Sequence, residues 1–233
     1  MTQPLFREDA YRRECEARVL SSSPEGIVLD ATVFYPQGGG QPGDSGRIEW
    51  SGGAAQVIDT RKGEGDQIVH IPEADSELPP EGEVVRGEID WDRRHRLMRM
   101  HSCMHLLSAV LPYPVTGGQV GDGVGRLDLD LAEAPDKEAV TEQLNELIKA
   151  DHPVQKRWID ENELDERPEL VKTLSVQPPR GAGQIRLIDI PGVDLQPCGG
   201  THVARTGEIG PVRVRKIEKK GRQNRRVKLE FAE

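Results

Sequence analysis

The chain has 233 residues, a formal net charge of −9 and only 4% aromatic residues. This length permits one large domain or two small ones, and the composition predicts a modest, largely aliphatic core. The acidic average argues against a nucleic-acid partner, but only weakly, because an average can conceal a local basic patch.

No part of the sequence predicts export or membrane insertion. The first residues contain no apolar signal region, and no apolar run is long enough to cross a bilayer. The three cysteines, Cys15, Cys103 and Cys198, favour free thiols or metal ligation over a disulfide framework. We therefore expect a soluble, cytoplasmic protein without a membrane partner.

The first third of the chain predicts a small β-barrel. The 25 glycines and 17 prolines indicate many turns and short elements. β-branched and aromatic residues predict short strands, which we place at 26–30, 31–35, 46–50, 54–59, 66–71 and 83–90. Several short strands at this spacing are typical of a barrel, which we assign to residues 1–91.

A glycine-rich loop interrupts these strands at 36–46, with the sequence PQGGGQPGDSG. It contains too much glycine for a helix or a regular strand. It is not a P-loop, because no Lys-Ser or Lys-Thr pair follows the glycines. Two interpretations stay open: the loop is a barrel turn that needs positive φ angles, or its bare backbone approaches a ligand.

A second domain is expected over residues 92–233. Apolar residues recur at helical spacing from 92 to 111, with Asp92 as the N-cap and Pro112 as the stop. A second glycine-rich turn is expected at 115–125. The remaining elements are strands at 126–131, 154–159 and 184–190, helices at 135–150 and 160–171, and a hairpin at 211–231 with its turn near 220–224. They predict an α/β two-layer domain, so the whole chain has an α+β fold.

Two pairs of residues have the spacing of metal ligands. His101 and His105 project from one face of the predicted helix. Cys198 and His202 flank a double glycine that permits a tight turn. Three imidazoles and one thiolate suit tetrahedral Zn²⁺. Either pair alone is weak evidence, since the alternative is a buried histidine pair and a structural cysteine, but both pairs together favour a metal site. The sequence leaves open whether His202 is a ligand and whether the ion is structural or catalytic.

The C-terminal hairpin alternates cations with apolar residues. This pattern predicts a strand pair with one positive face, which suits contacts to a phosphate backbone; a solvated charged face is the alternative. The candidate RNA-binding residues are Arg213, Arg215, Lys219, Lys220, Arg222, Arg225 and Arg226. A second cluster of cations stands at the start of the predicted helix: Arg93, Arg94, Arg96 and Arg99.

Three motifs together resemble a known family. The runs HSCMHLL at 101–107 and CGGTHV at 198–203 are similar to the two zinc motifs of the alanyl-tRNA synthetase editing domain. The run FYPQGGGQPGD at 34–44 resembles the glycine-rich motif of the barrel that precedes that domain. The motifs occur in the family's order over nearly the whole chain. The chain thus resembles the free-standing alanyl-tRNA editing proteins of the AlaX family, in the medium-length class that keeps the barrel.

The resemblance implies a trans-editing hydrolase that deacylates mischarged tRNA(Ala), chiefly Ser-tRNA(Ala) and in some members Gly-tRNA(Ala). It implies no ligase activity and no need for ATP, because the chain has no room for a class II aminoacylation domain. Zinc is assigned to His101, His105, Cys198 and His202, and the candidate catalytic residues are Thr32, Gln119 and Thr201. The chain departs from the family pattern at Ser102, where threonine is usual, and in the glycines around Gln119.

Two other classes of function stay open. A zinc-stabilised tRNA-binding module without catalysis predicts tight RNA binding, a closed metal shell and no ester cleavage. A metallohydrolase of small esters or amides predicts activity without tRNA and little dependence on salt. The basic hairpin argues against the metallohydrolase, and the glycine-rich loop together with the turn at 198–202 argues against the binding module.

Overall fold

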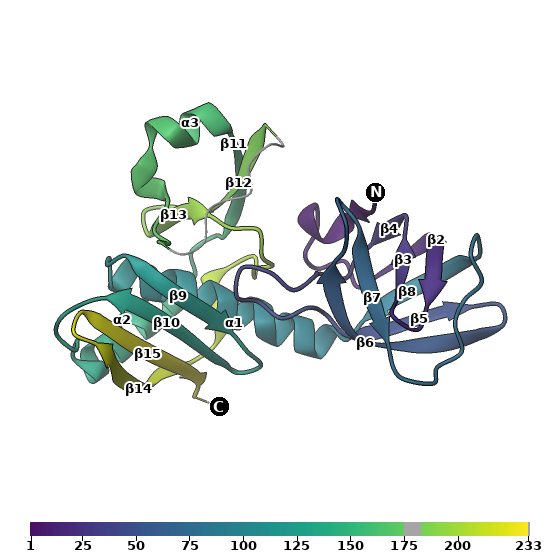
Figure 1. The fold of residues 1–233 in the computed structure, drawn as a ribbon. Coiled ribbons are helices and arrows are strands. Elements are labelled where there is room, and N and C mark those ends of the chain that lie inside the picture. The colour runs from purple at the N-terminus through teal and green to yellow at the C-terminus, as the bar shows by residue number, and fades with distance from the viewer. Residues whose placement is uncertain (175–182, 233) are drawn as a thin grey trace. The chain divides into compact units, whose positions relative to one another are not determined.

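The computed structural model describes residues 1–174 and 183–232 (Figure 1). The chain divides into two compact units, Met1–Arg96 and Leu97–Glu233, and each is described by itself. Among the described residues, no helix is both long and apolar enough to cross a membrane.

The first unit is a closed barrel in the strand order β2-β3-β7-β6-β5-β8, which confirms the predicted barrel. Its strands are β2 (Glu14–Ser23), β3 (Gly26–Leu29), β5 (Gly46–Trp50), β6 (Gly53–Lys62), β7 (Ile68–Pro72) and β8 (Val84–Ile89). Alternate residues of β2 and β8 point inward, as in any half-buried strand. The interior is filled by side chains with almost no exposure, among them Val19, Ile27, Phe34, Ile48 and Val85. The unit also contains the turn η1 (Leu5–Arg7) and the parallel pair β1 (Gln3–Pro4) and β4 (Ala31–Thr32).

The predicted strand at 31–35 is wrong beyond Thr32, where β4 ends. Val33, Phe34 and Tyr35 are nevertheless buried. The backbone N–H of Tyr35 donates to the carboxylate of Asp44 (2.6 Å) in place of a strand partner. The apolar run therefore enters the core from a loop, because a side-chain carboxylate takes the bond that a neighbouring strand would otherwise make.

The glycine-rich loop forms a tight turn. Gly38 and Gln41 exchange two backbone hydrogen bonds of 3.1 and 3.0 Å, and the Tyr35 hydroxyl donates to the Gly38 carbonyl oxygen (2.9 Å). Gly39 and Gly40, between them, have φ angles of +56° and +81°. These values agree with the interpretation as a turn that needs glycine.

Substituting alanine for Gly43 in this loop is expected to destabilise the barrel by about 2 kcal/mol or more. A Cβ at Gly43 would lie 2.0 Å from the carbonyl oxygen of Thr60 and 2.8 Å from its amide nitrogen, and backbone atoms cannot swing aside. Urea denaturation measures the loss. Gly38→Ala is the matched control, because its Cβ would meet only side-chain atoms at ordinary contact distance, those of Lys62 at 3.4 Å and the Tyr35 hydroxyl at 3.6 Å. Equal losses in the two variants would contradict the steric argument.

The second unit is built on an antiparallel sheet in the order β14-β15-β10-β9 (Figure 1). Its strands are β9 (Val115–Val120), β10 (Val124–Asp130), β14 (Val212–Gly221) and β15 (Asn224–Phe231). The helix α1 (Trp91–Val110) lies against one face of this sheet, where its Met100 and Met104 meet Gly125 of β10 and Met104 meets Gly118 of β9. The helix α2 (Lys137–Lys149) lies along β14. The side chains of Thr141 and Asn145 on α2 bond to the backbone of β14 and so cover the edge of the sheet.

A smaller antiparallel sheet contains β11 (Gln155–Asp160), β12 (Gln184–Ile190) and β13 (Asp194–Pro197). Together with α3 (Glu161–Glu166) and η2 (Pro168–Leu170) it encloses a separate core of Ile159, Leu164, Leu170, Ile185 and Leu187. The predicted helix at 160–171 is therefore interrupted, because Pro168 has no N–H to continue it. The short turn η3 (Thr206–Ile209) precedes β14.

Two further predicted boundaries are wrong. The region 115–125 is not one turn, because β9 occupies its first half and β10 begins at Val124. Its glycines allow close packing of the helix: a Cβ at Gly125 would lie 2.7 Å from the sulfur of Met100 on α1. The helix itself begins at Trp91, and the Asp90 carboxylate accepts the N–H of Arg93 (3.1 Å), where Asp92 was the predicted N-cap.

Candidate metal centre

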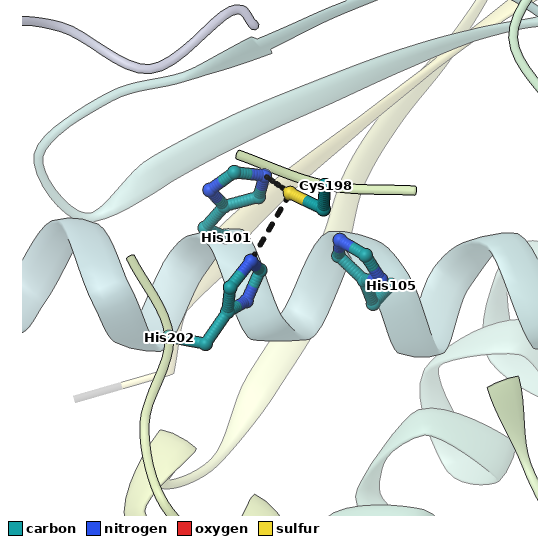
Figure 2. Close-up of side chains that lie close together, drawn as sticks. All are labelled: His101, His105, Cys198 and His202. Atoms are coloured by element: carbon teal, nitrogen blue, oxygen red, sulfur yellow. Dashed lines mark hydrogen bonds between the residues drawn. The ribbon is translucent and has the colours of Figure 1, made fainter. Parts of the chain in front are cut away.

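The four predicted ligands converge on one point in the second unit (Figure 2). His101 and His105 come from one face of α1, and Cys198 and His202 come from the loop that follows β13. The Sγ atom of Cys198 lies 3.2 Å from Nε2 of His202 and 3.5 Å from Nε2 of His101. One potential ligand atom from each of the four residues lies within 4.8 Å of the others. The two separate sequence pairs thus form one cluster.

The donor set fits a metal ion. In a tetrahedral zinc site with Zn–S of about 2.3 Å and Zn–N of about 2.1 Å, sulfur and nitrogen are separated by roughly 3.6 Å. The two sulfur–nitrogen separations in the cluster lie close to that value. The three imidazoles are almost fully buried, which shields the centre from water. The cluster can therefore hold a metal ion with four protein ligands.

In two of the imidazoles, the Nδ1 atom forms a hydrogen bond with a side chain outside the cluster. Nδ1 of His105 lies 2.8 Å from the carboxylate of Asp194, and Nδ1 of His202 lies 3.2 Å from the hydroxyl oxygen of Ser102. That hydroxyl also accepts the backbone N–H of Val203 (3.2 Å). Because a carboxylate can only accept, Asp194 places a proton on Nδ1 of His105, and the Ser102 hydroxyl holds the ring of His202 in position. Such contacts orient histidine ligands.

Asp194 is the centre of a buried polar network that sequence reasoning missed. Its carboxylate accepts from Lys172 Nζ (2.6 Å) and from the Gln196 amide (2.8 Å) as well as from His105. Burial alone would raise the pKa of Asp194, but the bond to His105 and the charge of Lys172 outweigh burial and lower it to about 2. The carboxylate is therefore charged at neutral pH and adds a negative charge beside the cluster.

The electrostatics of the cluster favour a cation. Burial alone would raise the pKa of Cys198, but its interactions with the neighbouring imidazoles of His101 and His202 hold it well below its ordinary value. Burial lowers the pKa of His202 to about 3. The pKa of His105 rises to about 9 despite its burial, because the imidazolium bonds to Asp194. A thiolate and a buried carboxylate thus flank the imidazoles, which is the charge pattern that receives a divalent cation.

The other predicted site residues lie in different surroundings. Thr201 is buried beside His202 in the loop of the cluster. Gln119 is exposed on the sheet face opposite α1, where its amide oxygen accepts from Arg126 Nε (3.1 Å), so the structure does not bring it to the cluster. Thr32 is fully buried in the barrel unit. Cys103 is buried in the core as expected, and burial raises its pKa to about 12.

The predicted RNA-binding cations divide into three groups. Arg225 is buried, and its guanidinium donates to the carbonyl oxygens of Gly221 and Asn224 and of Ala132. Four cations lie on the exposed sheet face and pair with acidic residues: Arg213, Arg215, Lys220 and Arg226. Lys219 and Arg222 are exposed near the hairpin tip. In the second predicted cluster, Arg94 is fully buried and cannot contact a partner. The hairpin prediction is thus wrong for Arg225, which has a structural role.

Replacing Asp194 by asparagine is expected to weaken metal binding about 10- to 100-fold, because the amide no longer holds the proton on Nδ1 of His105. Competition with a chromophoric zinc chelator measures the affinity. Asp189→Asn is the matched control on the neighbouring strand, where the carboxylate pairs with Arg157 (3.2 Å). Equal zinc affinities of the two variants would contradict the assignment.

Comparison with known proteins adds independent information. A family model described as class II (A) tRNA synthetases matches residues 8–93, and the second additional domain of threonyl and alanyl tRNA synthetases matches residues 185–228. The alanyl-tRNA editing protein AlaX-M of Methanosarcina acetivorans is 36% identical over 97% of this chain and 98% of its own length. That of Methanosarcina mazei is 38% identical over 97% of this chain and 95% of its own. The alanine–tRNA ligase of Pyrobaculum arsenaticum is 38% identical over 94% of this chain, which spans 25% of the ligase.

Proposed function

The chain belongs to the family of alanyl-tRNA editing proteins, and from this premise we propose that it hydrolyses the ester bond of mischarged tRNA(Ala). The proposed substrates are Ser-tRNA(Ala) chiefly and Gly-tRNA(Ala) in addition. The observation that carries the proposal is the buried cluster of His101, His105, Cys198 and His202 with its orienting contacts. Ester hydrolysis is energetically downhill, so the reaction needs no ATP, and we place it in the cytoplasm.

The proposed cofactor is Zn²⁺, because a thiolate with three imidazoles suits this ion. The four ligands would be Cys198 Sγ and the Nε2 atoms of His101, His105 and His202. When bound, the ion supplies a Lewis acid that polarises an acyl group. The protein's own contribution is to fix the ligands: Asp194 holds the proton on Nδ1 of His105, and the short loop through Thr201 places Cys198 and His202 above α1.

The attacking group is proposed to come from water or from the terminal ribose of the RNA. Asp194, whose carboxylate bonds to His105, is already bound by Lys172 and Gln196 and is held in its charged form, so it is poorly placed to take a proton from water. Burial of the imidazoles excludes bulk water from the centre, which strengthens the electrostatic interactions there.

A zinc-stabilised tRNA-binding module without catalysis is the second candidate. Four protein ligands fill a tetrahedral shell, and a filled shell is the usual sign of a structural ion. This candidate predicts stoichiometric zinc and RNA binding but no release of the amino acid.

Incubation of zinc-loaded protein with Ser-tRNA(Ala), Gly-tRNA(Ala) and Ala-tRNA(Ala) decides between the two. The editing proposal expects rapid release of serine while Ala-tRNA(Ala) is spared, and the rate for glycine defines the breadth of editing. Absence of release from all three esters, with zinc and RNA both bound, would support the binding module and overturn the enzyme proposal.

Replacing Thr32 by valine is expected to reduce discrimination of serine over alanine, because discrimination of a serine hydroxyl needs a buried polar partner. The Thr32 hydroxyl lies 2.7 Å from Nε2 of His70 and accepts the Phe34 N–H (3.1 Å). Burial lowers the pKa of His70 to about 4, so the ring is neutral; its Nδ1 donates to Ile27 O (2.9 Å) and its Nε2 accepts from the Thr32 hydroxyl.

The measurement for this variant is the ratio of kcat/KM for Ser-tRNA(Ala) and Ala-tRNA(Ala). Valine keeps the shape of threonine but leaves two buried partners without their hydrogen bonds, which costs about 1–3 kcal/mol of stability. A uniform loss of active protein leaves the ratio unchanged, so the ratio separates recognition from folding. An unchanged ratio would remove Thr32 from the proposed site.

A further inference from the structure

We propose that the exposed face of the β14-β15-β10-β9 sheet binds the phosphate backbone of RNA, at a hollow lined by Gln119, Arg126, Arg215 and Lys228. The choice of RNA as the partner rests on the proposed function. The location rests on strand register, on an excess of positive charge and on the shape of the surface. Arg126 and Gln119 were not among the residues expected from the sequence to bind RNA.

Strand register places three cations in one row across the sheet. Lys216 lies opposite Lys228, Lys228 lies opposite Arg126, and Arg126 lies opposite Gln119. Like charges directly opposite each other destabilise a sheet. This row is therefore a cost to the fold that a bound anion would remove.

A β-bulge adds a further cation to the same face. The register of β14 against β15 shifts between Val214 and Lys216, so Arg215 is an extra residue on the bulged strand. Val214 is buried, whereas the side chains of Arg215 and Lys216 are 63% and 65% exposed. Two consecutive cations thus reach solvent, which regular alternation would not allow.

The carboxylates on this face do not neutralise it. Glu218 is contacted by Lys216, Lys220 and Lys228, whose bonds lower its pKa to about 2. Two further carboxylates are each shared by two arginines: Glu230 by Arg213 and Arg215, and Asp128 by Arg126 and Arg226. Seven cations therefore share three carboxylates. Asp130, at the end of β10, is a fourth carboxylate on this face, so the face keeps an excess of three positive charges on a chain of net charge −9.

The surface is hollowed where these cations meet. A shallow depression of about 280 Å³ lies between β9, β10, β14 and β15, with Arg126, Arg215 and Lys228 around it. The amide oxygen of Gln119 accepts from Arg126 Nε, so the Gln119 NH₂ group remains available as a donor. Phosphate oxygens accept several charge-assisted hydrogen bonds at once, and three cations with one amide supply them. The acidic remainder of the chain then limits binding of RNA elsewhere.

The proposal is tested with Arg215→Gln/Lys228→Gln, which removes two charges from the hollow. The control is Lys137→Gln/Lys149→Gln, which removes two exposed charges from α2. Binding of deacylated tRNA(Ala) is followed by fluorescence anisotropy over a series of KCl concentrations. The hollow variant is expected to bind several-fold more weakly, and its plot of log affinity against log salt to be shallower by about 1.4–1.8, or 0.7–0.9 for each lost phosphate contact. Equal slopes for the hollow and control variants would overturn the proposal.

A third variant, Glu218→Gln, has the opposite expected sign. It removes a carboxylate that three lysines share, so RNA binding should tighten and the salt slope should become steeper. This variant also keeps the proposal testable if the double variant unfolds, since weaker or unchanged binding by Glu218→Gln would then overturn it.

Deacylation measured in parallel separates this inference from the proposed function. If the wild-type protein releases no amino acid, but the hollow variant binds RNA with a shallower salt slope than the control, the proposed function fails and the RNA-binding hollow stands. If the wild-type protein deacylates Ser-tRNA(Ala) and the hollow variant binds RNA like the control, the hollow fails and the proposed function stands.

Discussion

Replacing Cys198 by serine is expected to abolish stoichiometric metal binding and to reduce deacylation of Ser-tRNA(Ala) at least about 100-fold. A thiol beside His101 and His202 ionises readily, as its lowered pKa indicates, whereas a serine hydroxyl stays neutral and is a poor zinc ligand. The variant also loses the negative charge that offsets the imidazoles. Since metal binding is coupled to folding, the variant should melt at a lower temperature than the zinc-loaded wild type.

Metal content by mass spectrometry, melting temperature and deacylation rate check this result on the same preparations. Cys103→Ala is the matched control: Cys103 lies between the two histidines in sequence but is buried in the core, so its loss should leave metal content unchanged. Chelation of zinc from the wild type should reproduce the melting behaviour of Cys198→Ser, and zinc should restore only the wild type. Full metal content and full activity in Cys198→Ser would contradict the ligand assignment.

Local spacing predicted the metal cluster because its geometry is set by short segments. His101 and His105 share a helix face at four-residue spacing, and Cys198 and His202 are joined by one glycine turn. The network behind them could not be found in this way. Asp194 precedes Cys198 by four residues and Lys172 comes from a distant segment, so only the folded chain shows that they meet.

Strand alternation explains why Gln119 lies away from the metal cluster. Gln119 follows the two histidines of α1 closely in the sequence. Its neighbour Gly118 faces α1, and successive residues of a strand point to opposite faces, so Gln119 faces away from α1. The same alternation correctly predicted a positive hairpin face. It could not predict the bulge at Arg215 or the burial of Arg225, because both depend on contacts with other segments.

Replacing Arg94 by methionine is expected to lower the free energy of unfolding by about 3–5 kcal/mol, because it leaves the buried carboxylate of Asp44 without its counter-charge. The Arg94 side chain has no solvent exposure. Its Nε donates to both carboxylate oxygens of Asp44 (3.0 and 2.9 Å), and its terminal nitrogens donate to Val33 O (2.7 Å) and Ala10 O (3.0 Å). One arginine thus ties three segments of the barrel unit to the start of α1.

Urea denaturation of single and double variants tests this account. Arg94→Met/Asp44→Asn should recover part of the loss, because asparagine is neutral but still accepts the Tyr35 N–H that Asp44 binds. Arg86→Gln is the control for an ion pair at the surface, since Arg86 and Glu14 are both about half exposed, and its denaturation midpoint should hardly change. The account is wrong if Arg94→Met loses no more stability than Arg86→Gln, or if Asp44→Asn adds its full cost to that of Arg94→Met. Partial recovery would show that the charge of Asp44, more than the lost volume of Arg94, causes the instability.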